Sequence, residues 1–429
     1  MGFLEAYDAI AAKGGDPSTV AAAQMALFNQ QLDANPKGLF DDLRNNRPNF
    51  VVVPGMVCVT QFDDVEEVIT RDEFFSVQLY QPKMDRLSGP FVLAMDNTPT
   101  YSQFISILRL AFRREDGPRL VSLSGDIADK LIADAQAEGT IDLWKLGQLA
   151  PLRMVEQYYG VPGPDEATLL RWADDIFQDV FHNSSNDQAI TDKATVAGQE
   201  MCTYLDQLIA ERRASFASGG PAPTDVIGRL VHMQSDPSTN LTDEQIRSQI
   251  IGTITGTVDT TARAILGAFQ TFFEQPEQMA GATAAAESGN DALLSAYIWE
   301  AMRFHPQNTI IPRLCSGEYT VAKGTNRELT IPAGAVVFAA NFSAMFDSGK
   351  VDAPDEFRTN RPSSNYIHFG YAQHRCLGEY ISQVQLRETI KRLLKLKNLQ
   401  KAAGSDAQPV ALGNLPTEMT ITFDPGDAQ

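Results

Sequence analysis

"HFGYAQHRCLGEY", residues 368–380, places one of the four cysteines of the chain between a glycine-containing turn and the predicted start of a helix. The glycines allow the backbone to bend tightly or to approach a ligand closely. The amide donors of a helix N-terminus, together with Arg375 and His374, favour the thiolate over the thiol form of Cys376. The stretch therefore predicts a sulfur that carries negative charge.

Such a thiolate serves as a nucleophile, a zinc ligand or a haem ligand. Zinc needs three or four nitrogen or sulfur ligands at recognisable spacing, and His374 with His368 forms an unconvincing set. A nucleophile needs a histidine base and an orienting partner, and the five histidines of the chain lie in no motif that supports this. One thiolate is sufficient to hold haem iron. An inert, buried thiol is the alternative to all three.

The composition is that of a globular protein with an acidic surface. The 429 residues are 43% hydrophobic, which is enough to bury a large core. The formal net charge of −19 repels phosphate backbones and anionic membranes, so we expect no nucleic-acid partner. The four cysteines form no CxxC pair, which predicts a reducing cytoplasm. No apolar run near the N-terminus reaches membrane-spanning length, and we expect no membrane anchor.

Helical periodicity dominates the chain, and β-rich patches lie near both of its ends. The patches cover about residues 49–62, 310–342 and 408–425, and the first contains a hairpin hinged on Pro54 and Gly55. No repeat, low-complexity segment or long linker interrupts the sequence, so residues 1–429 are predicted to form one domain. The predicted fold class is mainly α with smaller β sheets.

One predicted helix is unusual. It begins with a capping box at Thr242 and Gln245 and continues to Pro276 without an obvious breaker. Its middle contains Gly252 and Gly256 among threonines, and each glycine costs about 1 kcal/mol relative to alanine. The glycines mark either close contacts with neighbours, with threonine hydroxyls bonded to the helix backbone, or a loosened turn that presents a carboxylate and a hydroxyl to a ligand.

The cysteine segment resembles the haem-binding signature of the cytochrome P450 superfamily, F-G-x-G-x-H/R-x-C-x-G. Five residues fall on this pattern: Phe369, Gly370, His374, Cys376 and Gly378. Ala372 stands where the family usually has its second glycine. The resemblance implies the cytochrome P450 fold, and it implies that the sulfur is the axial ligand of the iron of haem b.

Three further residues match the family in the expected order. Glu300 and Arg303 match its Glu-x-x-Arg pair, whose spacing puts both side chains on one face of a helix. Arg361, fifteen residues before the cysteine, resembles the third member. The resemblance implies that these three residues form a buried structural network that fixes the loop under the haem.

The resemblance also implies two contacts to haem propionates. Arg313 falls where relatives offer a guanidinium to one propionate, and His374 matches a second contact. A third usual contact, a histidine and an arginine on an early helix, is not reproduced. Tyr101 lies near the histidine position and Ile105 near the arginine position. We therefore expect Tyr101 to take the place of the family's usual anchor.

The unusual helix matches the family's oxygen-binding motif, [A/G]-G-x-[D/E]-T. Gly256, Asp259 and Thr260 fall on the motif, and Thr257 replaces its second glycine. The resemblance implies that the Thr260 hydroxyl and the Asp259 carboxylate deliver protons during cleavage of the O–O bond.

We expect a soluble, bacterial-type P450 monooxygenase that inserts one oxygen atom from O₂ into an apolar small-molecule substrate. Residues 74–95 and 172–183 resemble the family's pocket-covering loop and lid helices. No flavin or iron–sulfur segment is attached, so the expected electron donor is a separate ferredoxin with its reductase. It is expected to dock on the face nearest the cysteine, where four basic residues would form an island: Arg375, Arg387, Lys391 and Arg392.

Two alternatives remain. "WEAMRFHPQ" and "YISQVQL" are similar to bacterial relatives of the P450 half of fungal fatty-acid oxygenases, which predicts an enzyme that uses peroxide or isomerises a fatty-acid hydroperoxide. Asp259 and Thr260 argue against this alternative, because a peroxide route has less need of a proton relay. The other alternative is a haem-thiolate sensor without enzymatic activity.

Overall fold

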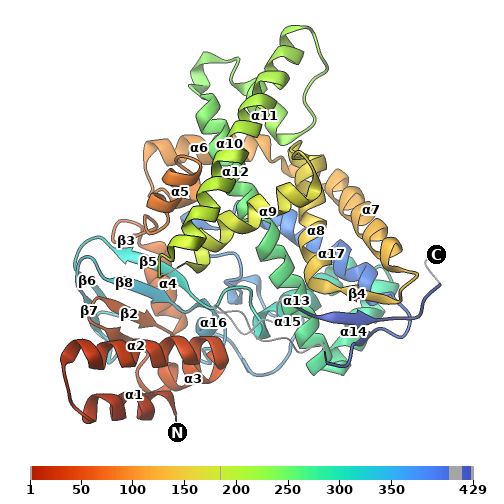
Figure 1. Ribbon diagram of the computed structural model, residues 1–429. Coiled ribbons are helices and arrows are strands. Elements are labelled where there is room, and N and C mark those ends of the chain that lie inside the picture. Colours follow the sequence, from red (N-terminus) through yellow and green to blue (C-terminus); the bar gives the residue numbers. More distant parts are fainter. Residues whose placement is uncertain (1, 184, 405–417, 427–429) are drawn as a thin grey trace.

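A five-stranded sheet forms one side of the molecule, next to the N-terminus (Figure 1). The computed structural model describes residues 2–183, 185–404 and 418–426. The order of strands in the sheet is β1-β2-β8-β5-β3. Their bounds are β1 (Asn49–Val53), β2 (Met56–Val59), β3 (Phe75–Ser76), β5 (Ile311–Cys315) and β8 (Val336–Ala339). The first predicted β-rich patch and the two ends of the second thus lie in one sheet.

The register of this sheet joins the two patches directly. Strands β1 and β2 form the predicted hairpin, in which Gly55 takes a left-handed φ of +83° that glycine adopts without strain. Strands β2 and β8 pair in parallel, with Val57 opposite Val337, and β8 pairs antiparallel with β5. This arrangement places β5, which carries Arg313, in the interior of the sheet.

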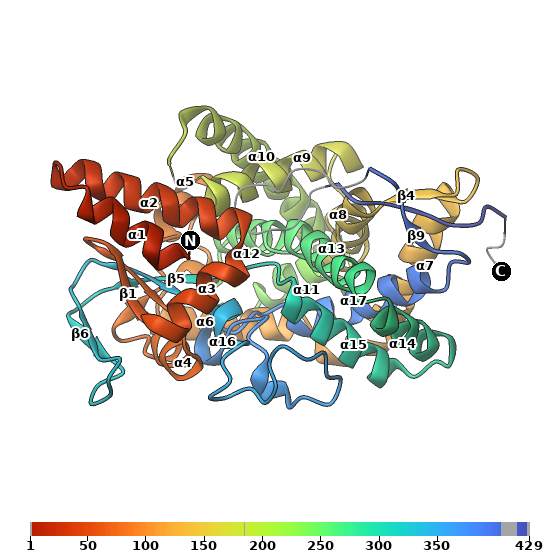
Figure 2. The ribbon, with the colours of Figure 1, turned by 90° about the horizontal axis from the view of Figure 1, so that it is seen from below.

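Three N-terminal helices pack beside the sheet (Figure 2). They are α1 (Phe3–Ala12), α2 (Pro17–Ala34) and α3 (Pro36–Asn46). Phe28 of α2 stacks on Phe338 of β8, with ring centroids 6.1 Å apart, and Tyr7 of α1 donates a 2.6 Å hydrogen bond to the carbonyl of Val52. Nearby elements are α4 (Phe62–Thr70), α16 (Asn341–Ala344) and the two-stranded sheet of β6 (Tyr319–Val321) and β7 (Leu329–Ile331).

Helices form the larger part of the molecule. Those that precede the interrupted helix are α5 (Gln81–Leu87), α6 (Pro99–Ala111), α7 (Gly117–Ala135), α8 (Leu143–Met154), α9 (Glu166–Phe177), α10 (Gln188–Ala217) and α11 (Val226–Met233). Those that follow are α12 (Asp243–Thr255), α13 (Val258–Glu274), α14 (Pro276–Glu287), α15 (Asp291–Phe304) and α17 (Glu379–Leu394). Helix α13 lies in the middle, with α8 on one side and α17 and α15 on the other (Figure 2).

A small antiparallel sheet completes the fold. It contains β4 (Thr140–Asp142), β9 (Gln400–Lys401) and β10 (Thr420–Thr422) in the order β4-β10-β9. Of the third predicted β-rich patch, residues 408–417 lie outside the described residues, and the rest supplies β10. The prediction of a mainly α fold with smaller sheets is confirmed. Among the described residues, no helix combines the length and the apolar character that crossing a membrane requires.

The prediction of one unbroken helix from Thr242 to Pro276 is wrong. The capping box forms as expected, but α12 ends at Thr255 and α13 begins at Val258. The interruption contains no proline. Several threonine hydroxyls there bond to backbone carbonyls, and such bonds compete with the regular helical pattern.

Candidate active site

The loop that carries Cys376 ends at the N-terminus of α17. The Cys376 amide donates a 2.8 Å hydrogen bond to the carbonyl of Phe369, which closes the loop. Gly370 makes this possible, because its φ of +71° lies in the left-handed region. The amides of Gly378 and Glu379, at the start of α17, point toward the sulfur and stabilise negative charge on it.

Burial nevertheless dominates the chemistry of this thiol. It raises the pKa of Cys376 to about 11, and the two helix amides offset only part of that increase. The charge of Glu379, which pairs with Arg375 at 2.5 Å, raises the pKa of Cys376 further, and the charge of Arg375 lowers it least. The prediction that helix amides and nearby positive charge favour the thiolate is therefore wrong for the chain by itself, because burial outweighs both. A bound metal cation is what deprotonates a buried thiol of this kind.

His374 is a neutral side chain in this setting. Burial, aided by the charge of Arg313, lowers the pKa of His374 to about 4, so the predicted positive charge beside the sulfur is absent at neutral pH. Neither ring nitrogen has a hydrogen-bond partner among the described residues, and a carboxylate oxygen of Asp72 lies 3.7 Å from Nε2. A buried imidazole without partners is ready to donate one hydrogen bond to an anion.

Arg313 presents a second group of this kind. Its side chain is only 6% exposed, its Nη1 donates to the carbonyl of Pro312, and its Nε has no partner among the described residues. Burial lowers the pKa of Arg313, although a guanidinium keeps its proton in proteins. A buried cation with an unused donor calls for an anionic partner. Together, Arg313 and His374 fit the two carboxylate groups of a haem.

Tyr101 supports this loop rather than offering a free hydroxyl. The residue is 1% exposed on α6, and its hydroxyl donates a 2.7 Å hydrogen bond to the carbonyl of Gln373. Its ring packs edge-on against His374, with centroids 5.4 Å apart. The side chain therefore acts on His374 by holding its loop and its ring in place.

Glu300 is the centre of a buried ionic network. Its carboxylate accepts hydrogen bonds from Arg303 at 2.7 and 3.0 Å and from Arg361 at 2.9 Å. The amide of Arg358 and the hydroxyl of Tyr366 each add a bond of 3.0 Å. Burial alone would raise the pKa of Glu300, but the two arginines outweigh it and lower the pKa. Sequence reasoning missed Tyr366 and Arg358. Tyr366 lies between Arg361 and the cysteine, and Arg358 lies three residues before Arg361.

The network ties a long loop to α15. Arg303 also donates to the carbonyls of Met345 and Glu356, and Arg361 donates to those of Ala353 and Glu356. Residues up to 66 positions from Glu300 in the chain are thereby held to its carboxylate. This loop leads directly into the segment that carries the cysteine.

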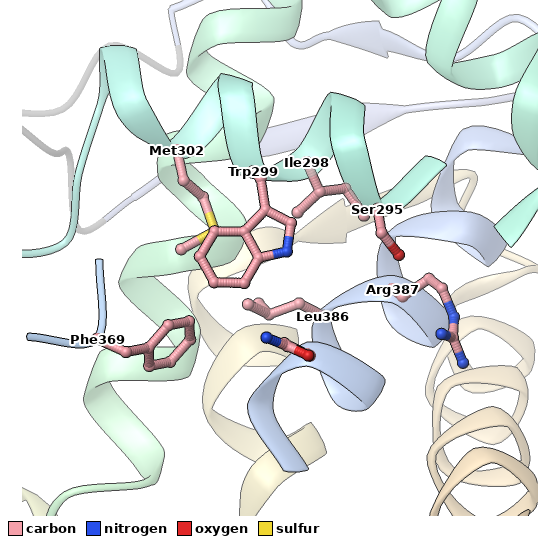
Figure 3. Close-up of a pocket in the computed structure, with 8 residues that line it drawn as sticks. Ser295, Ile298, Trp299, Met302, Phe369, Leu386 and Arg387 are labelled. Atoms are coloured by element: carbon pink, nitrogen blue, oxygen red, sulfur yellow. The ribbon is translucent and has the colours of Figure 1, made fainter. Parts of the chain in front are cut away.

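A small cavity lies between α15 and α17, with Phe369 of the cysteine loop at one end (Figure 3). Its volume is about 10 Å³, room for about one water molecule. The Trp299 ring, which points into it from α15, lies 5.4 Å from Phe369 and 5.1 Å from His368 between ring centroids. His368 also donates from Nε2 to the carbonyl of Trp299 at 2.9 Å. Aromatic packing thus supports the cysteine loop from this side.

The interrupted helix presents a hydroxyl and a carboxyl. The Thr260 hydroxyl donates a 2.6 Å hydrogen bond to the carbonyl of Gly256, an exposed residue in the interruption between α12 and α13. Asp259, one residue earlier, is 1% exposed and accepts a 3.3 Å hydrogen bond from Gln148 of α8 through one oxygen. Its other carboxylate oxygen has no partner among the described residues.

Asp259 holds its proton to an unusually high pH. Burial raises the pKa of Asp259 to about 6, the charge of Asp174 adds to this, and Arg263 and Gln148 oppose it. A carboxyl of this pKa takes up and releases protons near neutral pH. Sequence reasoning missed Gln148, Asp174 and Arg263. Only Arg263 had a signal, because it lies four residues after Asp259 on the same helical face.

Each of the two interpretations of the glycines applies to one of them. An added Cβ on Gly252 would lie 2.3 Å from the ring of Phe91, so Gly252 is needed for a close contact. A Cβ on Gly256 would meet only the Gly252 carbonyl at 3.5 Å and that of Thr253 at 3.9 Å, so Gly256 marks the loosened turn. The turn also brings the Thr257 hydroxyl within 3.1 Å of the Tyr159 hydroxyl.

The structure brings the cysteine loop close to the interrupted helix. Burial raises the pKa of Tyr159, and the charge of Cys376 is among the smaller contributions in the same direction, while Thr257 bonds to the same phenol. Tyr159 thus contacts the turn, and α13 packs against α17, the helix that follows the cysteine. Residues more than a hundred positions apart in the chain meet around one site.

Residues 172–411 match the family model of cytochrome P450. The chain belongs to the cytochrome P450 family. Its predicted family and its enzyme class, a cytochrome P450 monooxygenase, are confirmed. The structure of CalO2 is similar to this P450 with a TM-score of 0.81 at 21% identity, over 92% of this chain and 99% of that chain.

Two curated P450 relatives align with most of the chain. The steroid C26-monooxygenase of Mycolicibacterium smegmatis is 23% identical over 401 residues, which cover 92% of this chain and 94% of that protein. The mycinamicin IV hydroxylase/epoxidase of Micromonospora griseorubida is also 23% identical, over 88% of this chain and 92% of that protein.

The predicted basic island of this P450 is largely neutralised. Arg375 pairs with Glu379, and Lys391 pairs with Asp291 at 2.6 Å. Arg387 pairs with Asp291 and Glu388. Arg392 pairs with Asp129 and Glu388. The face near the cysteine loop therefore presents paired charges and not a field of free positive charge. Sequence reasoning missed this because three of the carboxylates lie elsewhere in the chain or on the buried side of α17.

Proposed function

We propose that this P450 is a haem-thiolate monooxygenase that inserts one oxygen atom from O₂ into an apolar small molecule. The observation that carries the proposal is that a partly buried cysteine at the N-terminus of α17 lies near the interrupted helix that presents Asp259 and Thr260. Two relatives support an apolar substrate, because one is named a steroid C26-monooxygenase and the other a vitamin D(3) 25-hydroxylase. The electron donor in this proposal is a ferredoxin with its reductase, and the location is a reducing cytoplasm, which the four free cysteines support.

In this proposal Cys376 holds the iron, and Arg313 and His374 bind the propionates. Phe369, Gly370 and Gly378 shape the loop around the sulfur, and Tyr101 holds His374 in position. Support comes from the unpartnered, buried donors of Arg313 and His374. When bound, haem supplies an iron at which O₂ is activated, and an electron-rich thiolate ligand favours cleavage of the O–O bond.

Asp259 and Thr260 supply protons in this proposal. The Thr260 hydroxyl is half-buried and bonded to one carbonyl, so it can rotate and donate elsewhere at the cost of one hydrogen bond. Asp259 lies one residue before it with one oxygen unpartnered, and its pKa of about 6 suits repeated uptake and release of a proton. Glu300, Arg303 and Arg361 take no part in chemistry and keep the cysteine loop in place.

The two segments predicted to cover the substrate pocket contact each other, which supports their role at its entrance. Lys83 of α5 donates from Nζ to the carbonyls of Asp179 at 2.6 Å and Asn183 at 2.7 Å, where the π-helical turn η4 (Gln178–His182) ends. Arg86 of α5 pairs with the buried carboxylate of Asp179. Substrate entry would require these bonds to open.

The test compares Cys376→Ala with Cys202→Ala, a control in which another partly buried cysteine is removed. Cys376→Ala is expected to abolish the red-shifted Soret band of the ferrous CO complex, whereas Cys202→Ala is expected to keep it. Aerobic turnover with a surrogate ferredoxin system is expected to exceed turnover with peroxide or a lipid hydroperoxide alone. A wild-type protein that stays colourless after reconstitution with hemin would contradict the proposal.

A further inference from the structure

Tyr159 is a buried phenol that the proposed reaction leaves without a role. It ends η3 (Val155–Tyr159), the π-helical turn that follows α8, and it is 2% exposed. Its ring packs edge-on against Phe112 with centroids 4.9 Å apart, and its hydroxyl lies 3.1 Å from Oγ1 of Thr257. A buried hydroxyl that loses its partner is costly, so this contact fixes the direction of the side chain.

The direction of this hydrogen bond follows from the other bond of Thr257. Thr257 Oγ1 lies 2.8 Å from the carbonyl oxygen of Thr253, which can only accept. The single proton of the Thr257 hydroxyl is therefore committed to Thr253. Tyr159 must be the donor toward Thr257, and the protons point in one direction from Tyr159 through Thr257 to Thr253.

The helix interruption leaves the Thr253 carbonyl, which ends this series of hydrogen bonds, without its usual backbone donor. In a continuous α-helix the Thr257 amide would donate to Thr253, four residues earlier. Here the amide donates to Ile254 instead, at 3.0 Å. The Thr257 hydroxyl therefore bonds to the Thr253 carbonyl in place of the Thr257 amide. Without this bond, the unpaired Thr253 carbonyl would favour a continuous helix.

We propose that Tyr159 is a positioning residue that keeps the helix open at Gly256. By donating to Thr257 it holds that hydroxyl on the Thr253 carbonyl, and the open turn leaves the Gly256 carbonyl facing the Thr260 hydroxyl. This inference rests on the proposed function, because it gives the turn its purpose in proton supply. It also assigns a role to the hydroxyl at position 257, where the family usually has glycine.

The decisive comparison is Tyr159→Phe against Tyr158→Phe. Tyr158 is the neighbouring, fully buried tyrosine, and its hydroxyl bonds to Asp116 at 3.0 Å, away from the turn. Both variants lose one buried hydroxyl. The carbon–oxygen stretch of the ferrous CO complex, measured by infrared spectroscopy, is expected to shift in Tyr159→Phe and to stay at the wild-type frequency in Tyr158→Phe. Equal spectra for the two variants would overturn the inference.

Amide exchange gives a readout that is independent of the iron. Loss of one hydrogen bond is expected to speed deuterium exchange in a peptide covering residues 253–261 by about two- to tenfold in Tyr159→Phe. Tyr158→Phe is expected to leave that peptide at the wild-type rate, even where its melting temperature falls. Exchange that is equally fast in both variants would show a general loss of stability and would contradict the positioning role.

A double-mutant cycle tests whether Tyr159 acts through Thr257. Thr257→Val leaves the Tyr159 hydroxyl and the Thr253 carbonyl without partners. Compared with Tyr159→Phe, this variant is therefore expected to show faster deuterium exchange in residues 253–261 and a larger shift of the CO stretch. Adding Tyr159→Phe to Thr257→Val is expected to change the CO stretch no further. Independent, additive effects would overturn the inference.

Thr260→Ala separates the two levels of the argument. If Thr260→Ala leaves the CO stretch unchanged, Thr260 does not face the bound ligand and the proposed function of the turn fails. If Thr260→Ala shifts the stretch while Tyr159→Phe matches Tyr158→Phe, only the role of Tyr159 fails.

Discussion

The two sides of the proposed haem site are held in opposite ways. On the cysteine side, one buried carboxylate, that of Glu300, accepts bonds from two arginines, a tyrosine and a backbone amide. On the oxygen side, single threonine hydroxyls bond to backbone carbonyls at the interruption between α12 and α13. The difference matches two chemical demands, because an iron ligand must keep its place whereas a proton donor must exchange partners.

The largest expected effect comes from breaking the strongly held side. Glu300→Gln leaves Arg303 and Arg361 buried without a matching negative charge, which is expected to cost about 3–5 kcal/mol of unfolding free energy. Urea unfolding measures the loss. Glu274→Gln is the control, since Glu274 pairs with His305 at the surface and such pairs contribute about 1 kcal/mol or less. Equal losses in the two variants would mean that the network is not the stronger support.

On the oxygen side, Asp259→Asn is expected to change how stability depends on pH. Asp259 has a pKa of about 6 in the folded chain, above its ordinary value of 3.8. Between these values the unfolded chain loses the proton first, so the wild-type carboxyl lowers stability progressively as the pH rises. The advantage of Asp259→Asn over wild type is therefore expected to grow by roughly 1–3 kcal/mol from pH 4 to pH 6 and to stay constant above. Urea unfolding at several pH values tests this, and a difference independent of pH would contradict it.

The two glycines of the interrupted helix allow a sharper comparison within one side. Gly252→Ala forces a Cβ toward the ring of Phe91 and is expected to cost about 1–3 kcal/mol of unfolding free energy. Gly256→Ala meets no such obstacle and is expected to be neutral or to add up to about 1 kcal/mol. Thermal unfolding of the two variants tests this. A larger loss of stability in Gly256→Ala than in Gly252→Ala would contradict the assignment of the close contact to Gly252.

Much of the cysteine side could be predicted because its residues follow fixed spacings. The signature around Cys376 is contiguous, and Glu300 and Arg303 lie one helical turn apart. Tyr366 could not be predicted as a partner of Glu300, because no spacing rule joins a loop tyrosine to a helix 66 residues earlier. The mainly α fold and the hairpin at Gly55 follow from periodicity and turn chemistry, which act locally.

The oxygen side was harder to predict because small energies decide its shape. No proline marks the interruption, and threonine hydroxyls compete with the backbone by only about a hydrogen bond each. Partners such as Tyr159 and Gln148 come from a part of the chain that precedes the interrupted helix by about a hundred residues. Their side chains carry no pattern that points to position 257 or 259.

The smallest expected effect concerns Ala372 in the cysteine loop. Its φ of +50° is left-handed, which costs an L-residue about 1–2 kcal/mol, while glycine pays roughly 0.5–1 kcal/mol in entropy. Ala372→Gly, which restores the family's usual glycine, is therefore expected to stabilise the protein by up to about 1 kcal/mol. Thermal unfolding measures this, with Ala353→Gly at φ +40° as a comparison outside the loop. A clear loss of stability in Ala372→Gly would show that the turn is not strained.

The paired charges near the cysteine loop have a consequence for electron delivery. Arg375, Lys391 and their carboxylates form alternating dipoles whose fields cancel over short distances. Electrostatic steering needs net charge that acts beyond the Debye length, about 8 Å at physiological ionic strength. In the proposed function, a donor protein that docks at this face would meet no local positive field, so close shape and contact would govern its docking there.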